Sequence, residues 1–182
     1  MKVEIIDELK KITPEPYIDE RGIYLEIFNK KEFATVSPVN FIQDDFSRSK
    51  KGVFRGLHGD QETWKLVSCS YGEIILLVLN CDIESASFGK SYSFQLNADR
   101  YCQILIPPMF ANGHFVMSEQ AIFNYKQSTY YEQYKQFSIN INSALLNDHT
   151  QSIKPLTLSK RDQDSNSIDN PANLKLYIQN CI

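Results

Sequence analysis

The sequence is poor in several features that define protein classes. Only seven of its 182 residues are glycine, seven are proline and three are histidine. So little glycine and proline excludes a collagen-like or low-complexity chain. No stretch approaches the roughly 18 apolar residues of a membrane span. The N-terminal sequence MKVEIIDELKKI mixes acidic with apolar residues, unlike a signal peptide. We therefore expect a cytoplasmic protein with no membrane partner.

Patterns for metals, disulfides and nucleic acids are also missing. The four cysteines, at 69, 81, 102 and 181, form no CxxC pair, which argues against a zinc knuckle or a disulfide framework. A metal-dependent enzyme of the β class needs a cluster of histidines with a carboxylate, but His58 is followed two residues later by Asp60. The net charge of −3 gives no case for nucleic acid. We expect no metal and no cofactor, while a small anionic substrate needs only local cations.

What is present indicates one folded, aromatic-rich domain over residues 1–182, with 42% hydrophobic and 12% aromatic residues. Short strand-like runs are separated by turn residues, and helical periodicity is almost absent before the C-terminal third. The candidate strands are residues 23–28, 39–46, 65–69, 73–80, 90–96, 102–107, 115–117, 121–128 and 137–141. This pattern predicts an all-β, antiparallel jelly roll with short C-terminal helical segments. Residues 74–79 are apolar on both faces, which predicts a central strand covered on both sides.

One stretch carries most of the candidate chemistry. GVFRGLHGDQETWKLV, at 52–67, places Arg55, His58 and Lys65 in otherwise strand-like sequence. These residues suit a proton-transfer site beside an anion, and they equally suit an ordinary hairpin with solvated cations. Gln43 and Asp45 share one face of a candidate strand, which suits either the edge of a nucleobase or contact with solvent.

Seven sequence pieces, in order along the chain, carry a resemblance to a known family. They are DERG at 19–22, FIQDDFSRSKKGVFRGLH at 41–58, KLV at 65–67, SFGK at 87–90, IPPMFANG at 106–113, YKQSTYY at 125–131 and LSKRD at 158–162. Together they resemble the dTDP-4-dehydrorhamnose 3,5-epimerase family of nucleotide-sugar epimerases. The resemblance implies a cupin-type jelly roll and a homodimer in which an N-terminal segment crosses to the partner. It also implies metal-independent epimerisation of a nucleoside-diphosphate 4-keto-6-deoxy sugar.

The resemblance also implies roles for individual residues. Removing a proton from carbon beside a ketone needs a base and a group that stabilises the enolate oxygen. His58 would be the base, Asp162 its carboxylate partner, and Lys65 the cation near the ketone oxygen. Tyr125 would deliver a proton to the opposite face. The resemblance implies that Arg55 contacts the substrate or its diphosphate and that Tyr131 lines the sugar pocket. The nucleotide would be contacted by Arg21, Glu26, Gln43 and Asp45, with Arg21 reaching across the dimer.

Four positions depart from the family pattern. The family motif AHGF is replaced by ANGH, so Asn112 stands for a pocket histidine and His114 is shifted by two places. On an earlier strand this chain has Leu76 where the family usually has an aspartate. It has Asp45 where the family commonly has an asparagine. We expect catalysis to survive with an altered fit, for example for a heptose. We expect His114 to point away from the site and, like His149, to have a structural or surface role.

Several choices stay open from the sequence. The nucleotide is dTDP or GDP, with Asp45 a hint of guanine because a carboxylate only accepts hydrogen bonds. The sequence leaves open whether the enzyme inverts C3 alone or both C3 and C5. It also leaves open whether the product serves a capsule, a lipopolysaccharide or an antibiotic sugar. Alternative functions are a cupin-type 3,4-ketoisomerase of nucleotide sugars and a non-catalytic module that binds them.

Overall fold

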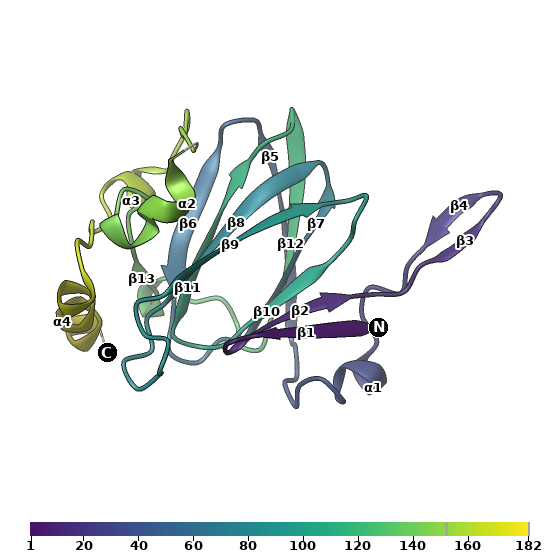
Figure 1. Ribbon diagram of the computed structural model, residues 1–182, viewed down its shortest axis with the longest axis horizontal. Coiled ribbons are helices and arrows are strands. Elements are labelled where there is room, and N and C mark those ends of the chain that lie inside the picture. Colours follow the sequence, from purple (N-terminus) through teal and green to yellow (C-terminus); the bar gives the residue numbers. More distant parts are fainter. Residues whose placement is uncertain (152, 182) are drawn as a thin grey trace.

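Two antiparallel sheets form the body of the protein, whose computed structural model describes residues 1–151 and 153–181 (Figure 1). One sheet has the strand order β1 (Lys2–Ile6), β2 (Leu9–Thr13), β10 (Gln103–Ile106), β7 (Lys65–Tyr71), β12 (Gln120–Gln127) and β5 (Gln43–Lys50). The other has the order β13 (Phe137–Ser138), β6 (Phe54–Gly59), β11 (Phe110–Val116), β8 (Glu73–Asn80) and β9 (Ser91–Asn97). The predicted all-β, antiparallel architecture is confirmed.

Strand β8 shows why the sequence folds into layers. Its side chains alternate between two faces, so Ile74, Leu76 and Val78 join the core between the sheets. Leu77 and Leu79 point to the other side, where C-terminal residues cover them. The prediction of a strand covered on both faces is therefore confirmed.

The C-terminal third supplies this outer cover (Figure 1). It contains the 3₁₀ turns η1 (Gln133–Lys135) and η2 (Ala144–Leu146) and the helices α2 (Asn147–Thr150), α3 (Lys160–Gln163) and α4 (Pro171–Cys181). Leu174 and Ile178 of α4 are fully buried in the same cluster as Leu77 and Leu79. These helices confirm the predicted short helical segments near the C-terminal end of the described chain. No helix of the described chain is long and apolar enough to cross a membrane.

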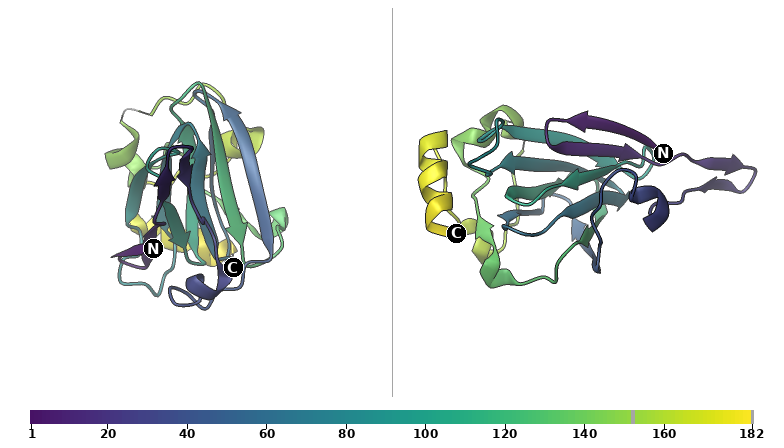
Figure 2. Two further views of the ribbon diagram at one scale, coloured as in Figure 1. Left: turned by 90° about the vertical axis from the view of Figure 1, so that its right-hand side faces the viewer. Right: turned by 90° about the horizontal axis from the view of Figure 1, so that it is seen from below.

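The N-terminal region adds two smaller features. Helix α1 (Lys30–Phe33) buries Phe33 against Leu66 and Leu105 of the six-stranded sheet. The hairpin of β3 (Tyr17–Asp19) and β4 (Gly22–Tyr24) projects from the body. Figure 2 shows this hairpin and α4 at opposite ends of the molecule.

Some strand boundaries differ from those predicted. The strand expected at 39–46 begins only at Gln43, because Phe41 packs in a cluster with Phe28 and Phe33. The strand expected at 23–28 ends at Tyr24, and the one expected at 137–141 ends at Ser138. By contrast, β11 begins five residues before the expected 115–117, since residues 110–113 pair with β8 although Ala, Asn and Gly, three of the four, are depleted in strands.

Candidate active site

A cavity of about 410 Å³ opens between the two sheets and is lined by side chains of β5, β6, β7, β11, β12 and the C-terminal segment. It brings together seven of the residues predicted from the sequence: Arg55, His58, Lys65, Asn112, Tyr125, Tyr131 and Asp162. These residues are spread over more than 100 positions of the chain. The fold therefore gathers the whole predicted catalytic set in one place.

His58, on β6, is paired with Asp162 of α3. The imidazole Nε2 lies 2.7 Å from the carboxylate Oδ1, and Asp162 is almost fully buried. Ser159 caps α3 and accepts a hydrogen bond from the Asp162 backbone N–H at 3.2 Å, which fixes the start of the helix. With Nε2 donating to the carboxylate, Nδ1 of a neutral imidazole carries the free lone pair. This arrangement suits a base.

Burial and hydrogen bonding act in opposite directions on this pair. Burial lowers the pKa of His58 below its usual 6.5, against the opposing effect of the hydrogen bond to Asp162. For Asp162, burial raises the pKa, but the hydrogen bonds that it accepts outweigh this effect and the net pKa is lowered. A neutral imidazole beside an ionised carboxylate is therefore the state expected at neutral pH.

Lys65, on β7, is buried inside the cavity. Its Nζ lies 3.8 Å from Asp60 Oδ2 and donates to the backbone oxygen of His58 at 3.3 Å. Burial lowers the pKa of Lys65, and the nearby Asp60 carboxylate opposes that shift. Asp60 is held in turn by the Thr63 backbone N–H at 2.7 Å. The sequence analysis missed this partner, although its place between His58 and Lys65 in HGDQETWK could have suggested it.

Two tyrosines of the cavity lie on β12 and on the loop after it. Tyr125 of β12 pairs in register with Asp45 of β5 and Val67 of β7. Burial raises the pKa of Tyr125, so its phenol keeps its proton at neutral pH. The backbone N–H of Tyr131 donates to Gln43 Oε1 at 2.9 Å, which ties the loop after β12 to β5.

The expectation that His114 points away from the site is wrong. Residues 112 and 114 lie two apart on β11, so their side chains share a face, and both line the cavity. The His114 ring stacks on Phe123 with ring centroids 4.2 Å apart. Burial lowers the pKa of His114 to about 3, which keeps this imidazole neutral. The shift of the histidine by two places thus leaves it in the same pocket.

Close approach of β6 and β11 shapes this side of the cavity. A Cβ at Gly113 would lie 2.7 Å from the backbone oxygen of Arg55, so only glycine allows the contact. The register between the strands also shifts between Asn112, which pairs with His58, and His114, which pairs with Arg55. The glycine in ANGH therefore brings Asn112 and His114 close to the catalytic strand.

The other predicted contacts do not line the cavity in this chain. Arg21 lies on the projecting hairpin, where it is exposed and paired with Asp19. Glu26 is on the surface and accepts a hydrogen bond from Asn29 at 3.0 Å. Gln43 and Asp45 share a face of β5, as predicted, and Gln43 Nε2 donates to Asp45 Oδ2 at 2.6 Å.

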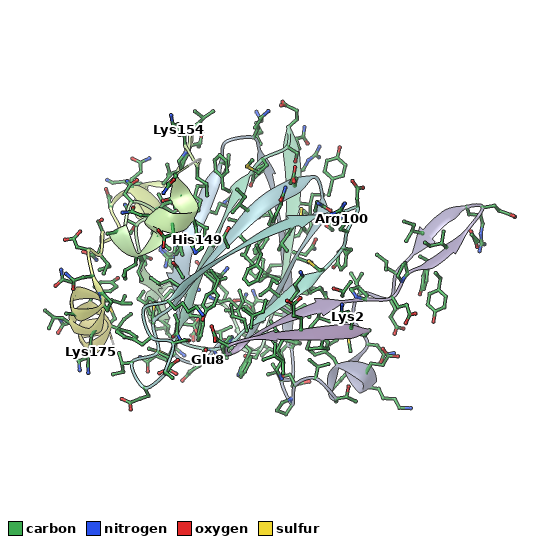
Figure 3. All side chains as sticks on the ribbon, viewed as in Figure 1. Lys2, Glu8, Arg100, His149, Lys154 and Lys175 are labelled. Atoms are coloured by element: carbon green, nitrogen blue, oxygen red, sulfur yellow. The ribbon has the colours of Figure 1, made fainter. Side chains whose placement is uncertain are left out.

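His149 does not line the cavity either. It lies on α2, where its Nε2 donates to the backbone oxygen of Ser91 at 3.1 Å (Figure 3). This contact agrees with a structural role. Among residues 1–151 and 153–181, no group of three or more His, Cys, Asp and Glu side chains has an arrangement that could hold a metal ion.

A neutral histidine, a protonated phenol and a buried cation in one cavity can together take a proton from carbon and return another. On an all-β jelly roll of the cupin type, this set of side chains is compatible with an enzyme of the isomerase class. Comparison with known proteins agrees, because the sequence model of the dTDP-4-dehydrorhamnose 3,5-epimerase family matches residues 4–170. The chain belongs to this family.

Individual relatives cover almost the whole chain. The dTDP-4-dehydrorhamnose 3,5-epimerase of Escherichia coli K12 is 35% identical over 94% of this chain and 95% of its own length. The enzyme of the same name from Shigella flexneri is 39% identical over 76% of this chain and 79% of its own. A Legionella pneumophila dTDP-6-deoxy-D-glucose-3,5-epimerase, solved with dTDP-4-keto-L-rhamnose, is 34% identical with a TM-score of 0.88, covering 100% of this chain and 96% of its own. These likenesses confirm the predicted fold and the isomerase class.

Proposed function

We propose that this protein inverts C3, C5 or both centres of a nucleoside-diphosphate 4-keto-6-deoxy sugar. The observation that carries the proposal is the buried His58–Asp162 pair, with a 2.7 Å contact, in the same cavity as Lys65 and Tyr125. The relatives named for this reaction support it, as does the dTDP-4-keto-L-rhamnose in the Legionella structure. The cytoplasmic location stays a prediction.

In the proposed reaction, Nδ1 of His58 takes the proton from a carbon next to the C4 ketone. The C–H bond breaks, its electron pair forms the C=C bond of the enolate, and negative charge develops on the ketone oxygen. Lys65 stabilises that oxygen, while Asp162 stabilises the imidazolium. Tyr125 then donates its phenol proton to the other face of the same carbon, which inverts the centre. Exchange with solvent returns the proton to Tyr125 and removes it from His58.

The nucleotide is the least constrained part of the substrate. We propose that Arg55 and Tyr131 contact the sugar and that Arg21 and Glu26 contact the nucleotide. Asp45 already accepts hydrogen bonds from Gln43 at 2.6 Å and from Gln127 at 3.1 Å. These bonds support a role for Asp45 in holding Gln43 toward the base, which weakens the hint of guanine. We therefore favour a dTDP-linked substrate over a GDP-linked one.

Solvent exchange tests the mechanism directly. The protein is incubated in heavy water with dTDP- and GDP-linked 4-keto-6-deoxyhexoses and heptoses, and deuterium is located by proton NMR and mass spectrometry. Label at C3 and C5 identifies a double epimerase, and label at C3 alone a 3-epimerase. His58→Asn should abolish exchange, whereas Tyr125→Phe should retain exchange at the carbon but lose inversion.

His149→Asn is the matched control, because His149 lies outside the cavity. Undiminished exchange in His58→Asn would disprove the proposed base. A product with its ketone at C3 would instead identify a ketoisomerase, and the absence of exchange with every sugar would favour the non-catalytic binding module.

A further inference from the structure

Two buried polar atoms in the cavity have no hydrogen-bond partner. They are the Ser47 hydroxyl oxygen on β5 and the Asn112 side-chain oxygen on β11, and the structure gives neither a partner among the described residues. Buried polar atoms are nearly always paired in folded proteins. Both side chains line the cavity, so a ligand bound there can supply the missing partners.

These atoms belong to a polar end of the cavity, formed by Ser47, Arg55, Asn112 and His114. Ser47 pairs in register with Phe123, on which His114 stacks, and His114 pairs with Arg55. Arg55 Nε donates to Ser49 at 3.0 Å, which holds the guanidinium in place and leaves its other N–H groups for a ligand. Asn112 pairs in register with the proposed base, His58, so the polar end begins beside this residue.

The donors and acceptors of the polar end select the chemistry of the ligand group. The Asn112 oxygen only accepts hydrogen bonds, Arg55 only donates, and Ser47 does both. A hydroxyl group both donates and accepts, so it satisfies all three. A carboxylate has no proton for Asn112, an ammonium is repelled by Arg55, and a methyl group leaves every polar atom unpaired.

The position of His114 indicates which part of the sugar carries that hydroxyl. In the resemblance drawn from the sequence, the last position of AHGF is phenylalanine and this chain has His114, so a wall that phenylalanine would make apolar is polar here. 6-Deoxyhexoses and longer sugars carry the same ring hydroxyls. The ring therefore does not explain why a polar residue, His114, lines this wall of the cavity. The group at C5 differs, since a 6-deoxyhexose ends there in a methyl group.

We propose, resting on the epimerase function above, that the polar end binds a hydroxyl on the exocyclic chain at C5. The preferred substrate is then a 4-keto sugar whose C5 chain is longer than a methyl group and ends in a hydroxyl. Ser47 and His114 are specificity-determining residues of this site. The catalytic residues His58, Lys65, Tyr125 and Asp162 act on either kind of sugar.

A pair of substrates that differ only in the C5 chain tests the proposal. One dTDP-linked 4-keto sugar carries a methyl group there, and the other a chain ending in hydroxymethyl. We expect kcat/KM for the hydroxyl sugar to exceed that for the methyl sugar by about 10–100-fold, because a site built for a hydroxyl rejects the analogue that lacks it. Ser47→Ala and His114→Phe should each reduce this ratio at least about fivefold.

Ser93→Ala is the control, since Ser93 is exposed on β9 and does not line the cavity. Ser47→Ala removes an atom without a partner in the free protein, so the variant should fold as well as the parent. Equal kcat/KM for the two sugars, a preference for the methyl sugar, or an unchanged ratio in both variants would each overturn the proposal.

The proposed function can fail separately from this inference. If neither sugar exchanges hydrogen with heavy water, the epimerase proposal fails, and the dissociation constants of the two sugars are compared by calorimetry instead. Tighter binding of the hydroxyl sugar, lost in Ser47→Ala, would still support the polar end. Equal dissociation constants would reject it.

Discussion

At the scale of the single residue, His58 combines two requirements that usually conflict. Burial lowers its pKa, which keeps the imidazole neutral and able to accept a proton. The Asp162 carboxylate raises the same pKa and stabilises the imidazolium once the proton has been taken. The net effect is a lowered pKa, which suits the proposed role of His58 as a base at neutral pH.

Asp162→Asn should disturb both parts of this balance. Because the pKa of His58 is below 6.5, the acidic limb of kcat/KM against pH should lie below pH 6.5 in the parent protein. Removing the carboxylate removes an effect that raises this pKa, so the limb should move to still lower pH. The plateau rate should fall about 10²–10⁴-fold, because the imidazole loses its orientation and its counter-ion.

The pH dependence of kcat/KM on the 4-keto sugar measures both effects. Asp164→Asn is the control, since Asp164 is exposed at the end of the same helix. A limb that moves to higher pH, or an unchanged plateau, would show that Asp162 does not act through His58.

At the scale of the element, α4 supports the catalytic strand from outside. The Tyr177 hydroxyl of α4 donates to the Ser138 backbone oxygen at 2.8 Å, and Ser138 pairs with His58 across β13 and β6. Leu174 and Ile178 fasten the helix to the five-stranded sheet by complete burial. This short C-terminal helix is therefore part of the frame that positions the base.

Leu174→Ala should test how much α4 contributes to stability. Replacing a fully buried leucine leaves a cavity and should lower the free energy of unfolding by about 2–5 kcal/mol. Leu176→Ala on the same helix removes a side chain that is 62% exposed, and should change it by less than about 0.5 kcal/mol. Urea denaturation followed by circular dichroism compares the two. Equal losses would mean that α4 does not pack on the sheet as described.

Sequence patterns predicted the elements whose own residues determine their structure. Residues 73–80 form β8 with the predicted bounds, because an unbroken apolar run has no other stable place than a strand covered on both faces. Residues 110–113 could not be predicted, since their pairing with β8 comes from the surrounding sheet and not from their own propensity.

The residues of the site likewise divide into those that the sequence predicted and those that it did not. The resemblance identified His58, Lys65 and Tyr125, and the fold places all three at one cavity. His114 was misjudged because the comparison of motifs considered its shift along the chain and not the two-residue period of a strand. Asp60 was missed because a buried lysine needs a counter-charge only once its burial is known.

At the scale of the whole molecule, the β3–β4 hairpin stands apart from the body with apolar side chains on its surface. Ile18 and Ile23 face each other across the hairpin and are 71% and 63% exposed, and Tyr17 and Tyr24 form a second exposed pair. An isolated two-stranded hairpin has little stability of its own, and exposed apolar patches mark contact surfaces. We propose that a second copy of this chain covers the hairpin in a homodimer.

Replacing both Ile18 and Ile23 with Asp should break that contact. Analytical ultracentrifugation should show a dimer for the parent protein and a shift toward monomer for the double variant, because carboxylates are costly to bury without partners. Leu176→Asp is the control, since Leu176 is similarly exposed but lies on α4, at the other end of the molecule from the hairpin. A monomeric parent, or a double variant that stays dimeric, would contradict the proposal.

The hairpin also carries Arg21, which lies outside the cavity of its own chain. If the hairpin crosses to the partner, Arg21 of one chain completes the site that contains His58 of the other. The test mixes inactive His58→Asn chains with weakened Arg21→Ala chains, dissociates them and lets them reassemble. Each mixed dimer then has one intact site, which combines His58 of one chain with Arg21 of the other. Activity should recover to about a quarter of the parent value, because half of the dimers are mixed and each has one such site. If Arg21 served its own chain, every site in the mixture would lack either His58 or Arg21, and no activity would be regained.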